Sequence, residues 1–155
     1  MDYEKEIQQL KEKIAYYEQF FHEMSAPIIP SIVENTILVP VAGYLTQDRL
    51  ESIRIRVLDY MGEHREINCA VIDFTGVEIK DIEQLDYSIF AHEIRQVDAS
   101  LKLMGIRPIF VGFNPRLVRE IVQERVHVTI ETYVNFKTAL ATLLKWTEKT
   151  LHSFE

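Results

Sequence analysis

The stretch VIDFTGVEIKDIEQLD, residues 71–86, decides the fold. Its apolar start predicts a strand over Asn68–Phe74 at the centre of a sheet, because a continuous apolar run suits a strand covered on both faces. Its second half predicts a helix that is capped by Asp81 and runs to about Met104, with Gly105 at the C′ position. We expect the inward face of this helix to carry Leu85, Ile89, Ile94, Val97 and Leu101. In α/β domains, a ligand or a modified residue usually lies where a strand runs into a helix.

Strands and helices alternate on both sides of this stretch. Strands joined by crossover helices predict an α/β fold with a mixed, mostly parallel sheet and helices packed on it. Before the stretch we expect a hairpin of Ile28–Val33 and Thr36–Val41 around Glu34-Asn35, then a helix from Thr46 to about Met61 with Leu50, Ile53, Val57 and Met61 inward. After it we expect a strand at Arg107–Val111, a helix from Asn114-Pro115 to about Glu124, a strand at Val128–Tyr133, and a helix capped by Asn135 with Phe136, Leu140 and Leu143 on its core face.

Residues 1–24 differ from the rest of the chain and predict an N-terminal coiled-coil helix ahead of a domain at 25–155. Apolar residues there follow a 3-4-3-4-3 spacing, which is typical of the a and d positions of a two-stranded coiled coil. This dimer seam consists of Ile7, Leu10, Ile14, Tyr17, Phe21 and Met24. It covers fewer than three heptads, so it needs support from the adjoining domain. The alternative is a single amphipathic helix packed on its own domain. Pro27 and Pro30 end the helix.

Composition narrows the classes of function. The chain has 155 residues, of which 47% are hydrophobic, and this suits one globular domain with an appended element. Its net charge of −7 argues against a nucleic-acid partner. The single cysteine, Cys69, excludes a disulfide scaffold and indicates a reduced, cytoplasmic setting. The N-terminus is not a signal peptide and no apolar run reaches the roughly 20 residues of a membrane span, so we expect no membrane partner.

Motifs for catalysis or cofactor binding are missing from the sequence. There is no G-x-G-x-x-G, Walker loop or G-x-S-x-G, and five glycines are too few for a backbone phosphate cradle. The five histidines have no spacing that suits a metal site. We therefore expect no catalytic residue, no metal and no cofactor.

Five phrases in the same order resemble the STAS domain, the sulfate-transporter and anti-sigma-antagonist fold. They are SAPIIP at 25–30, ILVPVAGYL at 37–45, VIDFTGV at 71–77, LMGIRPIFVGFNPRLVREIV at 103–122 and YVNFKTAL at 133–140. Within that fold they are most similar to the RsbR-type proteins of the bacterial stressosome. SAPIIP after a helix is the phrase most specific to this subfamily.

The resemblance implies a switch domain rather than a catalyst. Members of the family bind an anti-sigma-type serine kinase and assemble with other STAS-domain proteins. They are phosphorylated on a serine or threonine at the start of the helix after the third strand, and the RsbR type carries a further threonine in the helix after the fourth strand. We match these two positions to Ile82 and Glu120, and neither has a hydroxyl. The resemblance implies an anti-sigma factor antagonist. From the two departures we expect a member without phosphoacceptors, and from the N-terminal seam we expect a homodimer.

The other hydroxyl and charged residues near these two positions are explained by ordinary structural roles or by a partner surface. Thr75 lies at the strand end, where a turn role is expected, and we place Ser88 about two turns into the helix. The acids Asp81, Glu83 and Asp86 favour a helix N-terminus, each by roughly 0.3–1 kcal/mol. They either cap the helix or imitate a phosphorylated state, and the sequence leaves both open. Together with Arg116 and Arg119 they form the predicted partner surface.

Two functions from different classes follow from the sequence. The first is a dimeric regulatory module that binds other proteins. The second is a small-molecule module that holds a nucleotide or lipid in a pocket lined by Phe90, Phe110, Phe113 and Tyr133. The acidic turn weighs against a nucleotide, and aromatic residues are ordinarily part of the core. An enzymatic function is a third alternative, which no motif in the sequence supports.

Overall fold

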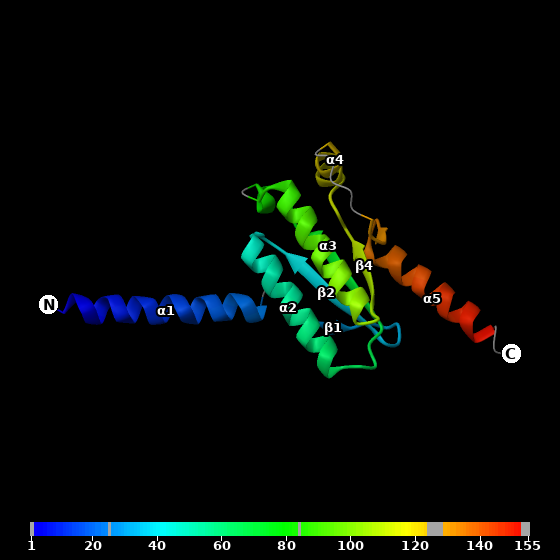
Figure 1. The fold of residues 1–155 in the computed structure, drawn as a ribbon, viewed down its shortest axis with the longest axis horizontal. Coiled ribbons are helices and arrows are strands. Elements are labelled where there is room, and N and C mark those ends of the chain that lie inside the picture. The colour runs from blue at the N-terminus through cyan, green and yellow to red at the C-terminus, as the bar shows by residue number, and fades with distance from the viewer. Residues whose placement is uncertain (1, 25, 84, 124–128, 153–155) are drawn as a thin grey trace.

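The computed structural model describes residues 2–24, 26–83, 85–123 and 129–152. Eleven elements alternate along these residues (Figure 1). They are α1 (Tyr3–Met24), β1 (Ile29–Pro30), β2 (Thr36–Ala42), α2 (Gln47–Glu63), β3 (Cys69–Gly76), the 3₁₀ turn η1 (Ile79–Ile82), α3 (Tyr87–Leu103), β4 (Arg107–Val111), α4 (Pro115–Gln123), β5 (Thr132–Tyr133) and α5 (Phe136–His152).

One five-stranded sheet organises the domain, with strand order β1-β2-β3-β4-β5. β1 is antiparallel to β2, and the three remaining pairings are parallel. One face packs on α2, α3 and α4, and the other packs on α5. This confirms the predicted α/β class and the mixed, mostly parallel sheet.

β3 occupies the centre of the sheet and contributes to both hydrophobic layers. Ala70, Ile72 and Phe74 join the core under α2 and α3, whereas Cys69 and Val71 join the core under α5. Burial on both faces explains why the strand reads as a continuous apolar run instead of an alternating one.

α2 follows the sequence pattern closely. The Thr46 hydroxyl accepts a hydrogen bond from the Arg49 backbone N–H at 3.1 Å, which caps the helix as expected. Its buried residues are the four predicted ones, Leu50, Ile53, Val57 and Met61. On the exposed side of the contact with α3, Arg54 Nη1 lies 3.3 Å from the buried carboxylate of Glu93.

The helix after β3 begins later than predicted. Asp81 does not cap it: a separate turn, η1, ends at Ile82, and α3 starts at Tyr87 with Asp86 as its N-cap. The inward face shifts accordingly. Phe90 is 1% exposed and Ile89 is 36% exposed, so the prediction that Ile89 faces inward is wrong. Gly105, with φ of +77°, follows the helix as expected.

The two edge strands are shorter than predicted. β1 holds two residues of the expected Ile28–Val33, and Pro30 within it limits pairing because proline has no N–H to donate. β5 holds Thr132 and Tyr133, and Val128 lies outside the described residues. Strands this short leave little free backbone for a further strand to pair with.

α1 stands apart from the domain. Every described side chain from Asp2 to Glu18 is exposed, and the helix projects away from the sheet and its covering helices (Figure 1). The alternative that this helix packs on its own domain is therefore wrong for these residues.

Candidate functional site

The carboxyl ends of β3 and β4 meet at one edge of the domain, because neighbouring parallel strands end on the same side. The chain enters η1 and α3 after β3, and it enters α4 after β4. We call this region the regulatory edge: η1, the first turn of α3, the first turn of α4 and the two strand ends. It is where the sequence placed the candidate site.

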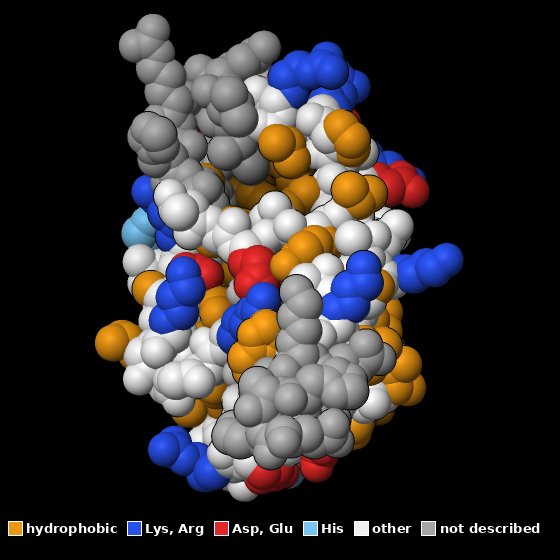
Figure 2. Space-filling view, turned by 90° about the vertical axis from the view of Figure 1, so that its right-hand side faces the viewer, with side chains coloured by type: hydrophobic (Ala, Val, Ile, Leu, Met, Phe, Trp, Pro, Cys, Tyr) orange, Lys and Arg blue, Asp and Glu red, His pale blue; other side chains and the backbone are white. Residues whose placement is uncertain are grey.

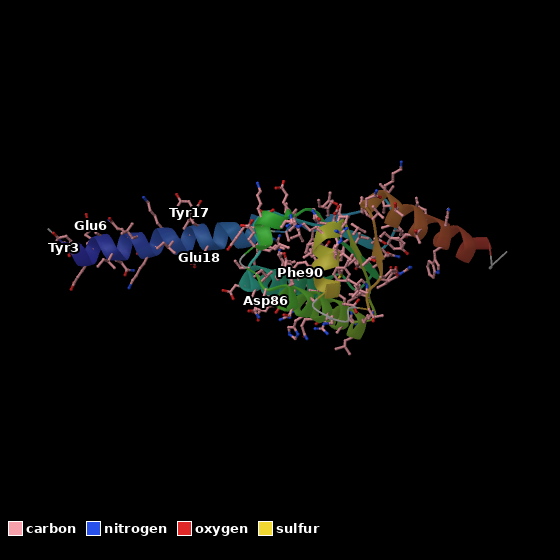
Figure 3. All side chains as sticks on the ribbon, turned by 90° about the horizontal axis from the view of Figure 1, so that it is seen from above. Tyr3, Glu6, Tyr17, Glu18, Asp86 and Phe90 are labelled. Carbon is pink, nitrogen blue, oxygen red and sulfur yellow. The ribbon has the colours of Figure 1, made fainter. Side chains whose placement is uncertain are left out.

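Asp86 and Ser88 define the start of α3. Asp86 Oδ1 accepts hydrogen bonds from the Ser88 backbone N–H at 2.7 Å and from the Ser88 hydroxyl at 2.5 Å. Both residues are exposed. The side-chain hydrogen bond from Ser88, followed by its backbone hydrogen bond, lowers the pKa of the Asp86 carboxyl below its usual value. The first turn of α3 thus presents a solvent-facing hydroxyl beside an ionised carboxylate (Figure 3 labels Asp86).

Ile82 does not occupy the first turn of α3, which corrects the sequence-based match. It lies in η1 and is 2% exposed, within the core under α2 and α3. Ser88, which we placed about two turns into the helix, instead lies in its first turn. Asp86 is the residue in the sequence that could have shown where α3 begins. It lies two residues before Ser88, which is the spacing between an N-cap and the N2 position.

The acids predicted as one surface have separate roles. Asp81 Oδ2 accepts a hydrogen bond from the Glu78 backbone N–H at 2.8 Å, and the Asp81 carbonyl accepts one from the Leu45 N–H at 2.8 Å. Asp81 thereby fastens η1 to the segment after β2. Glu83 is exposed, as is Asp86. Of the three acids, Asp81 holds η1, Asp86 caps α3, and Glu83 is exposed between them.

Arg49 lies close to the same turn. Its Nη1 donates a hydrogen bond to the Tyr44 carbonyl at 2.7 Å. Burial lowers the pKa of the Arg49 guanidinium, and the nearby carboxylate of Asp81 opposes this by raising it. The charge of Asp81 is thus partly offset within the domain, which favours capping over mimicry for this residue.

Thr75 is held at the end of β3, as its predicted turn role requires. Asp73 Oδ1 accepts hydrogen bonds from the Thr75 backbone N–H at 2.8 Å and from its hydroxyl at 2.5 Å. Gly112, with φ of +76°, approaches this turn from the end of β4. A Cβ at Gly112 would lie 2.2 Å from Thr75 Oγ1 and 2.6 Å from the Thr75 backbone nitrogen. Two strand ends are therefore locked together by a close backbone contact.

Replacing Gly112 by alanine is expected to destabilise the domain by roughly 3 kcal/mol, since the substitution adds steric overlap to an unfavourable positive φ. Gly105→Ala provides the matched control, because Gly105 has φ of +77° and open space around its Cβ position. We expect about 1 kcal/mol there, from the backbone term alone. Urea unfolding of both variants checks this. An equal loss of unfolding free energy in the two variants would show that Thr75 moves aside without strain when Gly112 gains a Cβ.

α4 supplies the basic part of the regulatory edge. Asn114 Oδ1 accepts a hydrogen bond from the Arg116 backbone N–H at 2.9 Å, so the predicted cap at Asn114-Pro115 is confirmed. Arg116, Val118 and Arg119 are exposed on this helix. Glu120 lies within α4, and its side chain lies outside the described residues.

The predicted aromatic pocket is wrong. Phe90, Phe110 and Phe113 each pack on Phe74, and Phe90 and Phe110 each pack on Phe113; the shortest ring-centroid separation is 5.1 Å, between Phe74 and Phe113. Tyr133 packs in the other layer, under α5. The sheet separates the two groups, so the four predicted lining residues do not face one space.

The rest of the described surface adds no metal or membrane feature. Among the described residues, no group of three or more His, Cys, Asp or Glu side chains is placed to hold a metal ion. None of the described helices combines the length and the apolar character that crossing a bilayer requires. On the face shown in Figure 2, basic, acidic and hydrophobic side chains are interspersed.

The dimer seam lies along one side of α1. Ile7, Leu10, Ile14 and Tyr17 are each more than half exposed. The side chains of Phe21 and Met24 lie outside the described residues. Tyr3 continues the same stripe toward the N-terminus and is 66% exposed, a residue that the sequence analysis missed although its spacing of four from Ile7 extends the pattern.

The chain is similar in sequence to RsbT co-antagonist proteins and to a blue-light photoreceptor. The chain is 27% identical over 132 residues to the RsbT co-antagonist protein RsbRA of Bacillus subtilis and 27% identical over 137 residues to RsbRB of the same organism. These matches cover 84% and 88% of the chain but 45% of each relative, so the chain spans less than half their length. It is also 27% identical over 119 residues to a blue-light photoreceptor of Listeria monocytogenes, covering 76% of the chain and 44% of the relative. No protein-family model matches the chain.

Solved structures with the same fold come from the same group of proteins. A serine-to-glutamate variant of RsbS from Moorella thermoacetica superposes with a TM-score of 0.62 at 16% identity, covering 79% of the chain and 97% of RsbS. A stressosome structure, described as a signal integration and transduction hub, gives 0.53 at 15% identity, covering 78% and 98%. The unphosphorylated anti-sigma factor antagonist SpoIIAA gives 0.52 at 11% identity, covering 77% and 97%. These likenesses establish the STAS fold, and over most of its length the chain is similar in sequence to the RsbR-type co-antagonists.

Proposed function

We propose that this chain is a regulatory protein–protein interaction module that works as a phosphorylation switch and is not an enzyme. It pairs through α1, assembles with other STAS-domain proteins in the cytoplasm, and receives a phosphate from an anti-sigma-type serine kinase. One observation carries the proposal: an exposed serine, Ser88, lies in the first turn of α3 with its hydroxyl bonded to the N-cap residue Asp86. The resemblance to RsbR-type proteins implies a phosphoacceptor at this place.

The position of Ser88 replaces the earlier expectation of a member without acceptors. That expectation depended on Ile82, which is buried in η1. Ser88 offers the alcohol that phosphoryl transfer from a serine kinase requires. The dipole of α3 favours a phosphate at this end of the helix. Glu120 remains the match for the second acceptor, so we propose one switching position in this chain.

Exposed charges around Ser88 suit a partner that recognises the edge by its charge. Glu83 and Asp86 lie before and at the start of α3, and Arg116 and Arg119 lie on α4. α3 and α4 are in contact, so both charge signs belong to one surface. Val118 adds an exposed apolar side chain on the same helix. Charge complementarity of this kind governs specificity and the rate of association.

Charge reversal at Arg119 tests the partner surface. We expect Arg119→Glu to weaken binding to a STAS-domain protein of the same organism about tenfold or more, while the free energy of unfolding changes by under about 0.5 kcal/mol. Titration calorimetry measures the affinity and thermal unfolding measures the stability. Arg65→Glu is the matched control, because Arg65 is an exposed arginine in the turn before β3, at the amino-terminal ends of the parallel strands. Equal losses in the two variants would remove α4 from the binding surface.

A further inference from the structure

We propose that α1 pairs with α1 of a second copy in parallel and in register, and that charges beside the dimer seam fix this orientation. The inference rests on the proposed dimerisation and adds the geometry of the pair. Its starting point is the exposed stripe of Tyr3, Ile7, Leu10, Ile14 and Tyr17, which the chain's own domain leaves uncovered.

Charged residues flank the stripe in a fixed pattern. With Ile7 and Ile14 at a positions, Glu6 and Lys13 fall at g positions on one flank, and Lys11 and Glu18 fall at e positions on the other. All four side chains are exposed (Figure 3 labels Glu6 and Glu18). A shallow groove runs from Leu10 and Tyr17 across Glu6 and Lys13 and on toward the outer face at Gln9, Glu12 and Tyr16, so the g flank adjoins the apolar stripe.

A parallel, in-register pair joins opposite charges across the seam. In a parallel coiled coil, a g residue faces the e residue five positions further along the other helix. Glu6 then faces Lys11 of the second copy, and Lys13 faces Glu18 of the second copy. The twofold symmetry of the pair makes each contact twice, and every charged e or g residue from Glu6 to Glu18 gains an opposite charge.

An antiparallel pair that places Ile7 opposite Tyr17 and Leu10 opposite Ile14 joins like charges instead. In an antiparallel pair, g residues face g residues and e residues face e residues. Lys11 then faces Lys11 of the second copy, Lys13 faces Lys13, and Glu4 faces Glu18. The charges that attract in the parallel pair therefore repel in this antiparallel register, and repulsion of this kind disfavours an unwanted arrangement.

The orientation decides where the two domains lie. α1 has 22 residues, so it is about 33 Å long at 1.5 Å per residue. A parallel pair places both STAS domains at one end, side by side, and both N-termini at the other end. An antiparallel pair places the domains at opposite ends of the rod. The parallel arrangement therefore gives a partner two neighbouring domains to contact.

Disulfide formation at Tyr3 tests the orientation. In a parallel pair, Tyr3→Cys places two cysteines at one d layer, within the roughly 4.4–6.8 Å between Cα atoms that a disulfide spans. In an antiparallel pair they lie roughly 27 Å apart along the axis. Cys69 does not interfere, because it is buried and its burial raises the pKa of its thiol to about 11. Glu12→Cys, on the outer face of the helix, is the control.

The expected result is near-complete cross-linking of the Tyr3→Cys dimer in a glutathione redox buffer and none of the Glu12→Cys dimer. Replacing Tyr3 could loosen the end of the helix, so Ile7→Cys, one layer further along the seam, serves as a second test with the same expected cross-link. A dimer by light scattering that cross-links at neither layer would overturn the parallel orientation and leave the seam intact. A monomer would overturn the proposed dimerisation itself.

Charge substitution tests the pairing across the seam. We expect Glu6→Lys to weaken the dimer about tenfold and Glu6→Lys with Lys11→Glu to restore affinity to within about threefold. Glu12→Lys makes the same charge change on the outer face and is expected to leave affinity unchanged. Analytical ultracentrifugation measures all four proteins. A double variant as weak as the single one would overturn the assignment of these charges.

Discussion

Replacing Leu10 and Ile14 by aspartate is expected to convert the proposed dimer into a folded monomer. Both side chains are more than half exposed on α1, so the isolated chain gains nothing from them. In a pair, each contributes roughly 1.5–3 kcal/mol on burial, and the symmetric dimer loses four of them at once. Several kcal/mol correspond to a fall in affinity of several powers of ten. Light scattering at micromolar concentration measures the mass directly.

The control for this double variant carries the same charges on the outer face. Gln8→Asp and Ala15→Asp lie away from the seam on the same helix, and both residues are exposed. Circular dichroism shows whether α1 remains helical, and thermal unfolding shows whether the domain remains stable. A dimer mass that persists in the Leu10→Asp, Ile14→Asp variant would show that the copies associate through another surface.

Ser88→Ala is expected to abolish phosphate uptake, and Ile82→Thr is expected to add none. Ser88 is exposed in the first turn of α3, whereas residue 82 is buried in η1 and out of reach of a kinase. The alanine variant keeps its fold, because Asp86 still accepts the backbone N–H at residue 88. Intact mass spectrometry after incubation with kinase and ATP measures the added phosphate.

The rate of this modification reflects two opposing effects. A phosphate on Ser88 brings about −1.5 to −2 charges to a helix N-terminus, where the dipole stabilises them. The Asp86 carboxylate, 2.5 Å from the hydroxyl, repels the same charges. Asp86→Asn keeps an oxygen for the cap and removes the charge. We expect this variant to be modified faster than the wild type.

The sequence predicted the sheet and α2 well because their signals are local. The run from Cys69 to Ile72 is apolar and buried on both faces of the sheet, and Thr46 lies at the spacing that an N-cap requires. The same reasoning failed at α3, where Asp81 and Asp86 both precede a helical pattern. The choice between them depends on Leu45, whose N–H binds the Asp81 carbonyl from a segment far away in the sequence. Sequence spacing alone does not contain that contact.

The sequence predicted where β3 and β4 end but not which turn follows β3. The edge after β3 and β4 is where the sequence put the candidate site, because a strand that runs into a helix is visible as a change of period. The acceptor was assigned to Ile82 because η1 was read as part of α3. The aromatic pocket failed for a similar reason: Tyr133 and Phe110 are adjacent in the sheet region but belong to opposite layers.

Phosphosite mapping on the wild type tests the central claim, that this chain is a switch with its acceptor at the start of α3. The protein is incubated with the anti-sigma-type serine kinase of the same organism and ATP, then analysed by intact mass and fragmentation. The account predicts one added phosphate on Ser88 and none on the Ser88→Ala protein. A phosphate that maps to Thr75, or one that persists in Ser88→Ala, would contradict it, as would a wild-type chain left unmodified while the same kinase modifies a STAS-domain partner in the same tube.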